Sequence, residues 1–273
     1  MDKKYAICYN KEISHSADVK DELSQILRIR GMNADILDID ALKTGYDFVF
    51  VIGGDGTILK TARFYAKTQT PVFGINLGRL GFLSQASKEN LEMSVEKILN
   101  HEFYTENRIM LESGNYIALN DIVIKGALAG RTSAFSLKIN DKPLCDYLAD
   151  GIIIATPTGS TAYGLSAGGP VVSPHLNAFV IVPICPHTLT ARPLVIPDDE
   201  KITICGTDPQ SKYLFSADGQ EFSEFKQKIE IKKSKYAAKL ALLNDSEFYG
   251  ILKNKLHWGV SPACIDNATG KNA

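Results

Sequence analysis

The chain has 273 residues, of which 45% are hydrophobic, and this is enough apolar material for two buried cores. Its 30 Lys and Arg residues nearly balance its 31 Asp and Glu residues, so no overall charge attracts nucleic acid or an anionic membrane. No apolar run reaches membrane-spanning length, and the N-terminus lacks the apolar stretch of a signal peptide. We therefore expect a cytoplasmic protein with neither a nucleic-acid nor a membrane partner.

The cysteines and histidines give no sign of a metal site. The five cysteines lie far apart, mostly inside apolar segments, and no Cys-x-x-Cys spacing occurs. The five histidines form no His-x-x-x-His pair. We expect buried free thiols and no metal held by the protein alone.

The first hundred residues alternate short apolar runs with segments of helical period. Strands are predicted at 5–9, 34–38, 48–52 and 72–75. Helices are predicted around Val19–Leu27, after Gly56, and around Leu91–Leu99. Alternation of this kind predicts a parallel sheet with helices on both faces.

The loop Gly53-Gly54-Asp55-Gly56-Thr57 joins the most apolar of these strands to a helix. In an open α/β sheet this junction is where ligands bind, because the glycines admit a bulky anion and the helix start has unpaired N-H donors. Asp55 is a poor neighbour for phosphate unless a metal ion lies between them, or unless it takes a proton from an attacking hydroxyl. The alternative is a plain glycine-rich turn that caps the helix. A second loop with glycines, Asn76–Leu83, follows the next strand, so the two loops could line one cleft.

After about residue 100 the pattern becomes β-type. Short apolar runs separated by turn residues are found at 122–124, 135–139, 152–154, 180–184, 202–205, 213–217, 229–231 and 240–243. They predict an all-β domain. Helical spacing returns at Phe248–Leu256, which predicts a terminal helix that packs back on the first domain. The expected domains are 1–102, completed by about 245–273, and 103–244.

The segment Asp150–Pro170 is rich in glycine and hydroxyl side chains. Small residues let a ligand approach the backbone, Thr and Ser offer hydrogen bonds to phosphate or ribose, and Tyr163 can cover a base. The sequence contains neither the P-loop pattern nor the Gly-x-Gly-x-x-Gly pattern of ordinary redox dinucleotide sites.

Together these motifs resemble the NAD kinase family. The resemblance rests on the Gly53–Thr57 loop, Asn76–Leu83, Asn120-Asp121, Asp150–Pro170, Pro186–Leu194 and Asp218-Gly219-Gln220, in family order. It implies an N-terminal α/β domain and a C-terminal β-sandwich. It also implies a homotetramer or homodimer that transfers phosphate from ATP, or another polyphosphate donor, to the adenosine 2'-hydroxyl of NAD.

The resemblance also implies roles for single residues. Asp55 matches the general base on the 2'-hydroxyl, and the expected NAD contacts are Gly56, Lys60, Asn120, Asp121, Arg131, Leu148, Asp150, Thr161, Ala162, Tyr163, Gly164, Leu165, Ser166 and Gln220. Asp121 stands where the family usually has Glu, and Leu148 where relatives often carry a basic residue. Asp150 could reach NAD across a subunit interface. Lys60 could instead be a solvated helix residue, since exposed lysines are the rule.

Charge neutralisation during phosphoryl transfer would come from Mg²⁺ or another divalent cation bound to the phosphate donor, because magnesium prefers phosphate oxygens and water to an all-protein cage. The alternative enzyme is a lipid kinase of the diacylglycerol or sphingoid type, which shares the glycine loop. The segment Asp150–Pro170 favours an NAD kinase. A nucleotide-binding regulatory protein without turnover is a third possibility, against which the intact Asp55 argues.

Overall fold

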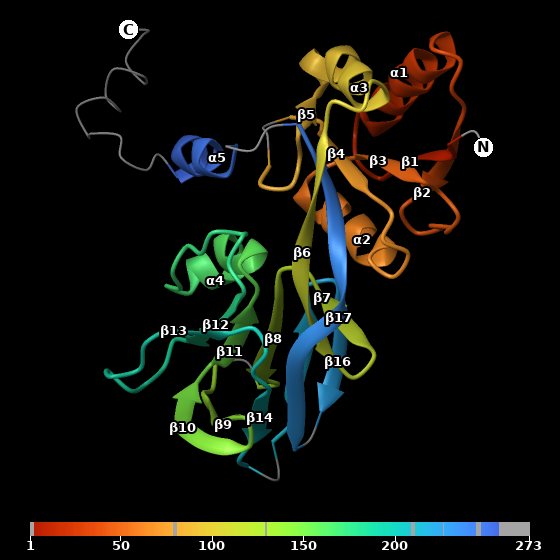
Figure 1. Cartoon of the computed structure of the whole chain (residues 1–273). Coiled ribbons are helices and arrows are strands. Elements are labelled where there is room, and N and C mark those ends of the chain that lie inside the picture. The colour runs from red at the N-terminus through yellow and green to blue at the C-terminus, as the bar shows by residue number, and fades with distance from the viewer. Residues whose placement is uncertain are drawn as a thin grey trace, which may run out of the picture.

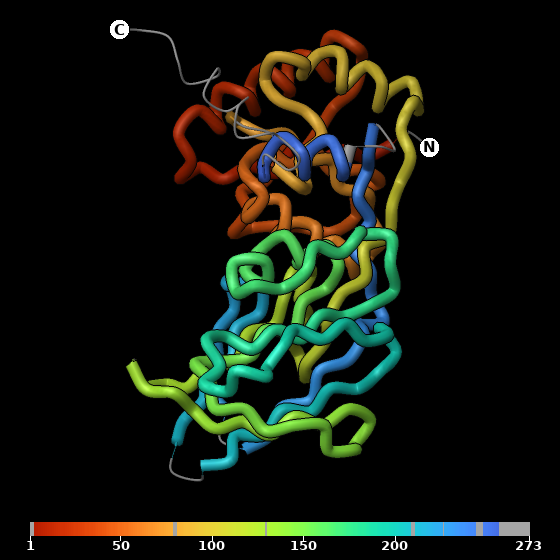
Figure 2. Tube along the Cα trace, turned by 90° about the vertical axis from the view of Figure 1, so that its left-hand side faces the viewer, coloured from red at the N-terminus to blue at the C-terminus, as the bar shows by residue number. Residues whose placement is uncertain are grey.

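The computed structural model describes residues 3–78, 81–128, 130–208, 211–225, 227–243 and 247–256. Figure 1 shows two stacked halves, with the N-terminal segments in the upper half and most of the later strands in the lower half. Figure 2 shows the same division from the side.

The upper half contains a parallel sheet in the order β4-β3-β1-β2. Its strands are β1 (Tyr5–Tyr9), β2 (Ala34–Asp38), β3 (Phe48–Ile52) and β4 (Val72–Asn76), which confirms the predicted alternation. Helices α1 (Ser16–Ile29) and α3 (Leu91–Leu99) pack on one face, and α2 (Asp55–Tyr65) packs on the other. Every residue of β3 is buried, because helices cover both faces of that strand.

The lower half is a β-sandwich, as expected. One layer is an antiparallel sheet in the order β13-β12-β11-β8-β15-β16. Its strands are β8 (Asp121–Gly126), β11 (Gly151–Ala155), β12 (Ala178–Ile184), β13 (Leu194–Pro197), β15 (Tyr213–Ala217) and β16 (Glu221–Phe225). The facing layer has the order β10-β9-β14-β17, from β9 (Ser133–Ile139), β10 (Lys142–Ala149), β14 (Ile202–Gly206) and β17 (Lys228–Leu242). The apolar side chains of both layers meet in one core.

One long strand, β17 (Lys228–Leu242), runs through both halves. The sequence predicted separate runs at 229–231 and 240–243, but both belong to β17, a strand of 15 residues. The prediction was wrong here because the polar residues between the runs were taken for a turn, whereas they continue the strand through a register shift between Lys233 and Ala237. β17 pairs with β14 below and with β4 above.

β6 (Tyr104–Ser113) runs antiparallel to β17 along most of its length (Figure 1). The sequence did not predict β6, because its first half carries charged and polar side chains. The remaining short elements are β5 (Ala86–Ser87), β7 (Tyr116–Ala118), α4 (Tyr163–Ser166) and the 3-10 helices η1 (Lys88–Asn90) and η2 (Thr158–Thr161).

The last described element is α5 (Glu247–Leu256), the predicted terminal helix. It returns to the first half, where the Lys255 ammonium lies 5.2 Å from the centre of the Phe82 ring. It also borders a pocket with Val171 and Ser173 of the second half. In the described part of the chain, none of the helices combines the length and the apolar character needed to cross a bilayer.

Candidate functional site

The glycine loop after β3 adopts the geometry that its residues predict. Gly53 has a φ of 154°, and a Cβ on it would lie 2.6 Å from the Thr57 hydroxyl oxygen, so the turn requires glycine. Its N-H donates to the Ile75 carbonyl of the neighbouring strand at 2.9 Å. Asp55 is the first residue of α2, which places its carboxylate at the positive end of the helix.

The second loop holds this carboxylate in place. The N-H of Phe82 donates to Oδ2 of Asp55 at 2.9 Å, and the N-H of Leu83 donates to Oδ1 at 3.3 Å. A Cβ on Gly81 would lie 1.8 Å from Asp55 Oδ1, so a side chain there would displace the carboxylate. The two loops therefore lie together, as predicted from their neighbouring strands. Arg79 and Leu80 of the second loop lie outside the described residues.

A pocket of about 400 Å³ opens on the outer face of the six-stranded sheet. It is lined by Asn120, Asp121, Val123, Lys125, Ala162, Tyr163, Leu214, Phe215, Ser216, Asp218, Gly219 and Phe222. The walls are mostly apolar, which is typical of sites for organic ligands of the size of a nucleoside. Asn120, Asp121 and Asp218 lie together at one end, here called the polar end, whereas Lys125 lies further along β8.

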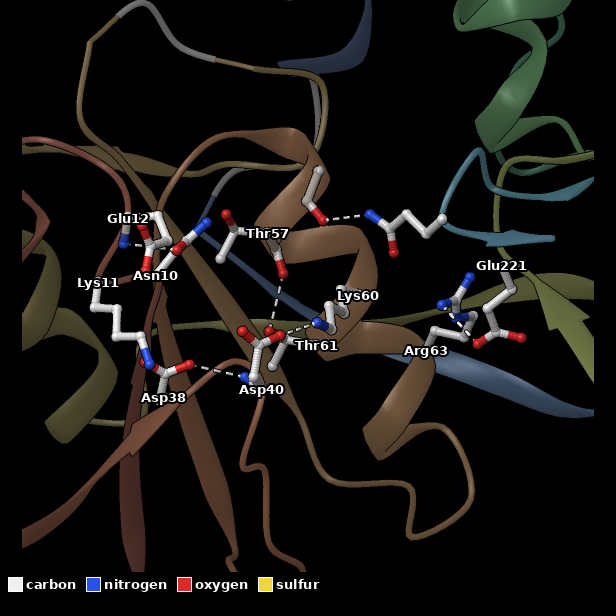
Figure 3. A network of polar contacts seen from close by, with 12 residues as sticks. Asn10, Lys11, Glu12, Asp38, Asp40, Thr57, Lys60, Thr61, Arg63 and Glu221 are labelled. Atoms are coloured by element: carbon white, nitrogen blue, oxygen red, sulfur yellow. Dashed lines mark hydrogen bonds and ion pairs between the residues drawn. The ribbon is translucent and has the colours of Figure 1, made fainter.

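Three contacts, one made by Gln220 and two by Arg63, join this pocket to the helix that begins at Asp55. The side-chain N-H of Gln220 donates to the carbonyl of Gly56 at 2.9 Å. The Arg63 guanidinium contacts Asp218 at 3.2 Å and Glu221 at 2.9 Å, and Figure 3 shows Arg63 and Glu221 facing each other between α2 and the lower half. The pocket is thus connected by direct contacts to α2, the helix that carries Asp55.

The motifs of the two halves match two family models. Residues 6–103 match the ATP-NAD kinase N-terminal domain, and residues 119–243 match the ATP-NAD kinase C-terminal domain. An NAD kinase of Carboxydothermus hydrogenoformans is 41% identical over 234 residues, which cover 81% of this chain and 83% of the relative. The chain belongs to the NAD kinase family. An NAD kinase of Chlorobium phaeobacteroides is 43% identical over 231 residues, covering 81% of this chain and 80% of the relative.

Solved structures agree with the NAD kinase family. The structure of an NAD kinase from Archaeoglobus fulgidus in complex with ATP aligns with a TM-score of 0.79 at 28% identity, covering 93% of this chain and 98% of that one. Yeast NADH kinase complexed with NADH has the same fold, with a TM-score of 0.85 at 23% identity, over 95% of this chain and 88% of that one. The matches support the NAD kinase interpretation and give no support to the lipid kinase alternative.

Apart from Lys60, the expected NAD contacts fall into three groups in the structure. Asn120, Asp121, Ala162 and Tyr163 line the pocket, while Gly56 and Gln220 form the contact beside it. Thr161, Gly164, Leu165 and Ser166 belong to the same short segment as Ala162 and Tyr163 but are not pocket-lining residues. Arg131, Leu148 and Asp150 are exposed and also lie outside the lining.

Lys60 faces a different surface from the pocket. Its ammonium donates to Oδ1 of Asp40 at 2.5 Å (Figure 3). Together with Arg63 it lines a second cavity between α2 and the segment after β2. A contact between Lys60 and NAD would require this ion pair to exchange.

The segment Asp150–Pro170 is built around the backbone of Asn120. A Cβ on Gly159 would lie 2.0 Å from the Asn120 carbonyl oxygen, so the close approach requires glycine. The Thr156 hydroxyl donates to the Leu119 carbonyl at 2.6 Å and accepts the N-H of Gly159 at 3.0 Å. The Thr156 hydroxyl therefore helps to shape the pocket wall at Asn120 from within the protein.

Sequence reasoning missed several pocket residues, Val123, Lys125, Leu214 and Phe222 among them. The alternation of side chains along a strand could have identified two of them. Asp121, Val123 and Lys125 alternate along β8 and all line the pocket, while the residues between them enter the sandwich core. The Lys125 ammonium lies 4.9 Å from the centre of the Tyr163 ring, an attraction that steadies this wall.

Two acidic groups at the polar end of the pocket have perturbed acidities. Burial, and then the nearby Asp218, raise the pKa of Asp121 to about 7. Burial also raises the pKa of Asp218, while three backbone N-H groups and Arg63 oppose that rise. Of the two, Asp218 is therefore the carboxylate whose negative charge is stabilised by hydrogen-bond donors and an ion pair.

Proposed function

We propose that this member of the NAD kinase family transfers the terminal phosphate of ATP, or of another polyphosphate donor, to the 2'-hydroxyl of the adenosine ribose of NAD. The product is NADP. The observation that carries the proposal is the Gln220–Gly56 contact, because it joins a nucleoside-sized pocket to the residue next to Asp55. Phosphoryl transfer requires just such alignment of an acceptor hydroxyl with a positioned carboxylate.

Asp55 is the proposed general base. Each of its oxygens accepts one backbone N-H, which fixes the direction of the carboxylate and leaves lone pairs for a substrate hydroxyl. Its position at the start of α2 surrounds it with the positive end of a helix dipole, where phosphate oxygens are also favoured. The hydroxyl of the ribose would give its proton to Asp55 as the bond to phosphorus forms.

The pocket is the proposed site for the adenosine part of NAD. Tyr163 and Phe222 provide ring surface for a bound base, while Asn120 and Asp121 offer hydrogen bonds at the polar end. The relative crystallised with ATP and the one crystallised with NADH support adenine nucleotides as ligands of the family.

The exposed residues Arg131, Leu148 and Asp150 fit a role in an oligomer. We propose that they contact NAD bound to a neighbouring subunit of a homodimer or homotetramer. Their exposure and their absence from the pocket lining support this assignment.

The residues present fit a divalent cation that arrives with the phosphate donor. Within the described ranges, no three His, Cys, Asp or Glu side chains are grouped to hold a metal ion. One half-buried carboxylate beside a glycine loop suits an ion whose other ligands are phosphate oxygens and water. Such an ion would neutralise charge on the transferring phosphate.

Incubation of the purified protein with NAD and Mg-ATP tests the proposal. We expect NADP to accumulate and to require both substrates and the divalent cation. Diacylglycerol and sphingosine, offered separately with labelled ATP, should remain unphosphorylated. Labelled lipid without NADP would overturn the proposal in favour of the lipid kinase, and nucleotide binding without any product would favour a regulatory protein.

A further inference from the structure

Arg63 is a buried cation on the same helix as Asp55. Its side chain is only 8% exposed, and its two terminal nitrogens reach two different acids. One contacts Oδ2 of Asp218 at 3.2 Å and the other Oε1 of Glu221 at 2.9 Å. A guanidinium suits this arrangement because its planar fork donates in two fixed directions. Arg63 thereby connects α2 to the turn between β15 and β16.

Asp218 in turn contacts the backbone of the pocket wall. Its side chain is 0% exposed, and its carboxylate accepts the N-H groups of Leu119, Asn120 and Asp121 at 2.9, 2.7 and 3.1 Å. Asn120 and Asp121 line the pocket. The carboxylate must stay ionised to accept all three N-H groups and the guanidinium, since a protonated carboxyl loses acceptor capacity.

We propose that Arg63 is a positioning residue for phosphoryl transfer, which fixes the pocket wall at Asn120 and Asp121 relative to Asp55 at the start of its own helix. The inference rests on the proposed function. Gln220 provides a second connection, from the same turn to the carbonyl of Gly56. Asp218 and Gly219 have φ values of 55° and 61°, so the turn is left-handed at both residues. Asp218, which contacts Arg63, and Gln220, which contacts Gly56, therefore belong to the same turn.

The charged groups that face Asp218 decide how the loss of Arg63 would show itself. They are Arg63 on α2, Asp121 on β8 and Glu221 on β16. Arg63 stabilises the ionised carboxylate of Asp218, whereas the acids Asp121 and Glu221 do not. Without Arg63, Asp218 would take up a proton at higher pH and release the N-H groups that it holds.

The test compares Arg63→Met and Arg63→Lys with the unaltered protein. In Arg63→Met, kcat should fall about tenfold or more, because displacement of the reacting groups by a fraction of a bond length is costly. The KM and the calorimetric Kd for NAD should change less than about threefold. The acid limb of the kcat profile should move to higher pH by about one unit or more. Arg63→Lys should restore part of the kcat and reverse part of the shift in the acid limb, since an ammonium can reach one acid but not two.

Arg30 offers a matched control. It also contacts two acids, Glu92 at 3.3 Å and Glu96 at 3.7 Å, but it connects α1 to α3 on the other face of the sheet. Arg30→Met should leave kcat and its pH profile unchanged, even where thermal unfolding shows a loss of stability. That contrast separates positioning from general support of the fold.

Each outcome has a distinct meaning. If the unaltered protein makes no NADP, the proposed function fails and not merely the role of Arg63. If the unaltered protein is active while folded Arg63→Met keeps its kcat and its acid limb, the inference is overturned. If Arg63→Met does not fold, Arg63→Lys decides in the same way, and an unchanged kcat and pH profile in that variant would overturn the inference.

Discussion

Asp121 and Asp218 are joined by two backbone contacts at the polar end of the pocket. The N-H of Asp121 donates to Oδ1 of Asp218 at 3.1 Å, and the N-H of Asp218 donates to the Asp121 carbonyl at 2.9 Å. Both carboxyls are buried, so their charges repel each other in a poorly solvated place. Arg63 and three N-H groups stabilise the charge on Asp218, while burial and then the nearby Asp218 raise the pKa of Asp121 to about 7.

This relationship predicts a pH-dependent stability. The folded protein keeps the Asp121 proton up to about pH 7, whereas the unfolded chain loses it near pH 3.8. A raised pKa contributes most at low pH, so stability should fall as pH rises from about 4 to 7. Asp121→Asn removes the effect, and its free energy of unfolding relative to the unaltered protein should increase by about 2 to 3 kcal/mol between pH 5 and pH 8. Urea unfolding of both proteins at pH 5 and pH 8 measures this change. If the difference in free energy of unfolding between the two proteins is the same at both pH values, the assigned pKa of Asp121 is wrong.

Asp121 should also matter for NAD binding. Asp121→Ala should raise the KM for NAD about tenfold, because losing a hydrogen bond to a charged or strongly polar group costs on the order of 1.5 to 3 kcal/mol. Asp121→Glu, which restores the usual residue of the family, should be mild. Steady-state kinetics at saturating Mg-ATP make the comparison. Unchanged NAD kinetics in Asp121→Ala would remove this residue from the site.

Gly81 should be needed for the position of the Asp55 carboxylate. A methyl group on Gly81 would lie 1.8 Å from Asp55 Oδ1, so Gly81→Ala should lower kcat about tenfold or more through misplacement of the base. Gly78 in the same loop is a matched control, because its nearest neighbour to an added Cβ is 4.0 Å away. Gly78→Ala should keep normal turnover. Equal kcat values for the two variants would show that the contact has no effect on catalysis.

The ion pair between Lys60 and Asp40 allows a direct test of the proposed contact of Lys60 with NAD. If Lys60 exchanges Asp40 for NAD, Asp40→Asn should free the ammonium and lower the KM for NAD about twofold to threefold. Lys60→Met should raise it. In the double variant the KM should equal that of Lys60→Met, because Asp40→Asn then has no ammonium to free. Unaltered KM values in both single variants would assign Lys60 to the second cavity alone.

Much of the fold follows from local patterns in the sequence. Phe48–Ile52 is apolar at every position and is buried at every position, and the helical stripe around Val19 and Leu23 faces the core as predicted. β17 could not be predicted as one strand, because its middle residues are polar and their pairing with β6 depends on segments more than a hundred residues apart. The pairing of distant segments is a property of the whole fold.

The same distinction applies to the site. Asp55, Asn120, Asp121 and Tyr163 were expected from their motifs, and the structure brings the last three into one pocket. The contact of Arg63 with Asp218 was not predicted, because these residues are 155 positions apart and a single arginine in a helix gives no sign of its partner. Phe222 lies beside the family motif that contains Gln220, but its ring becomes part of the pocket only when β15 and β16 pair.

If Asp55 accepts the proton of the attacking hydroxyl, Asp55→Asn should lose turnover but keep most of its affinity for NAD. Asparagine keeps the size of the side chain and one carbonyl oxygen for the N-H of Phe82, but it cannot take a proton. We expect kcat for NADP formation in Asp55→Asn to fall by roughly 10² to 10⁴, while the calorimetric Kd for NAD changes only severalfold. Near-normal turnover in Asp55→Asn would show that Asp55 is not the general base, whatever the binding result.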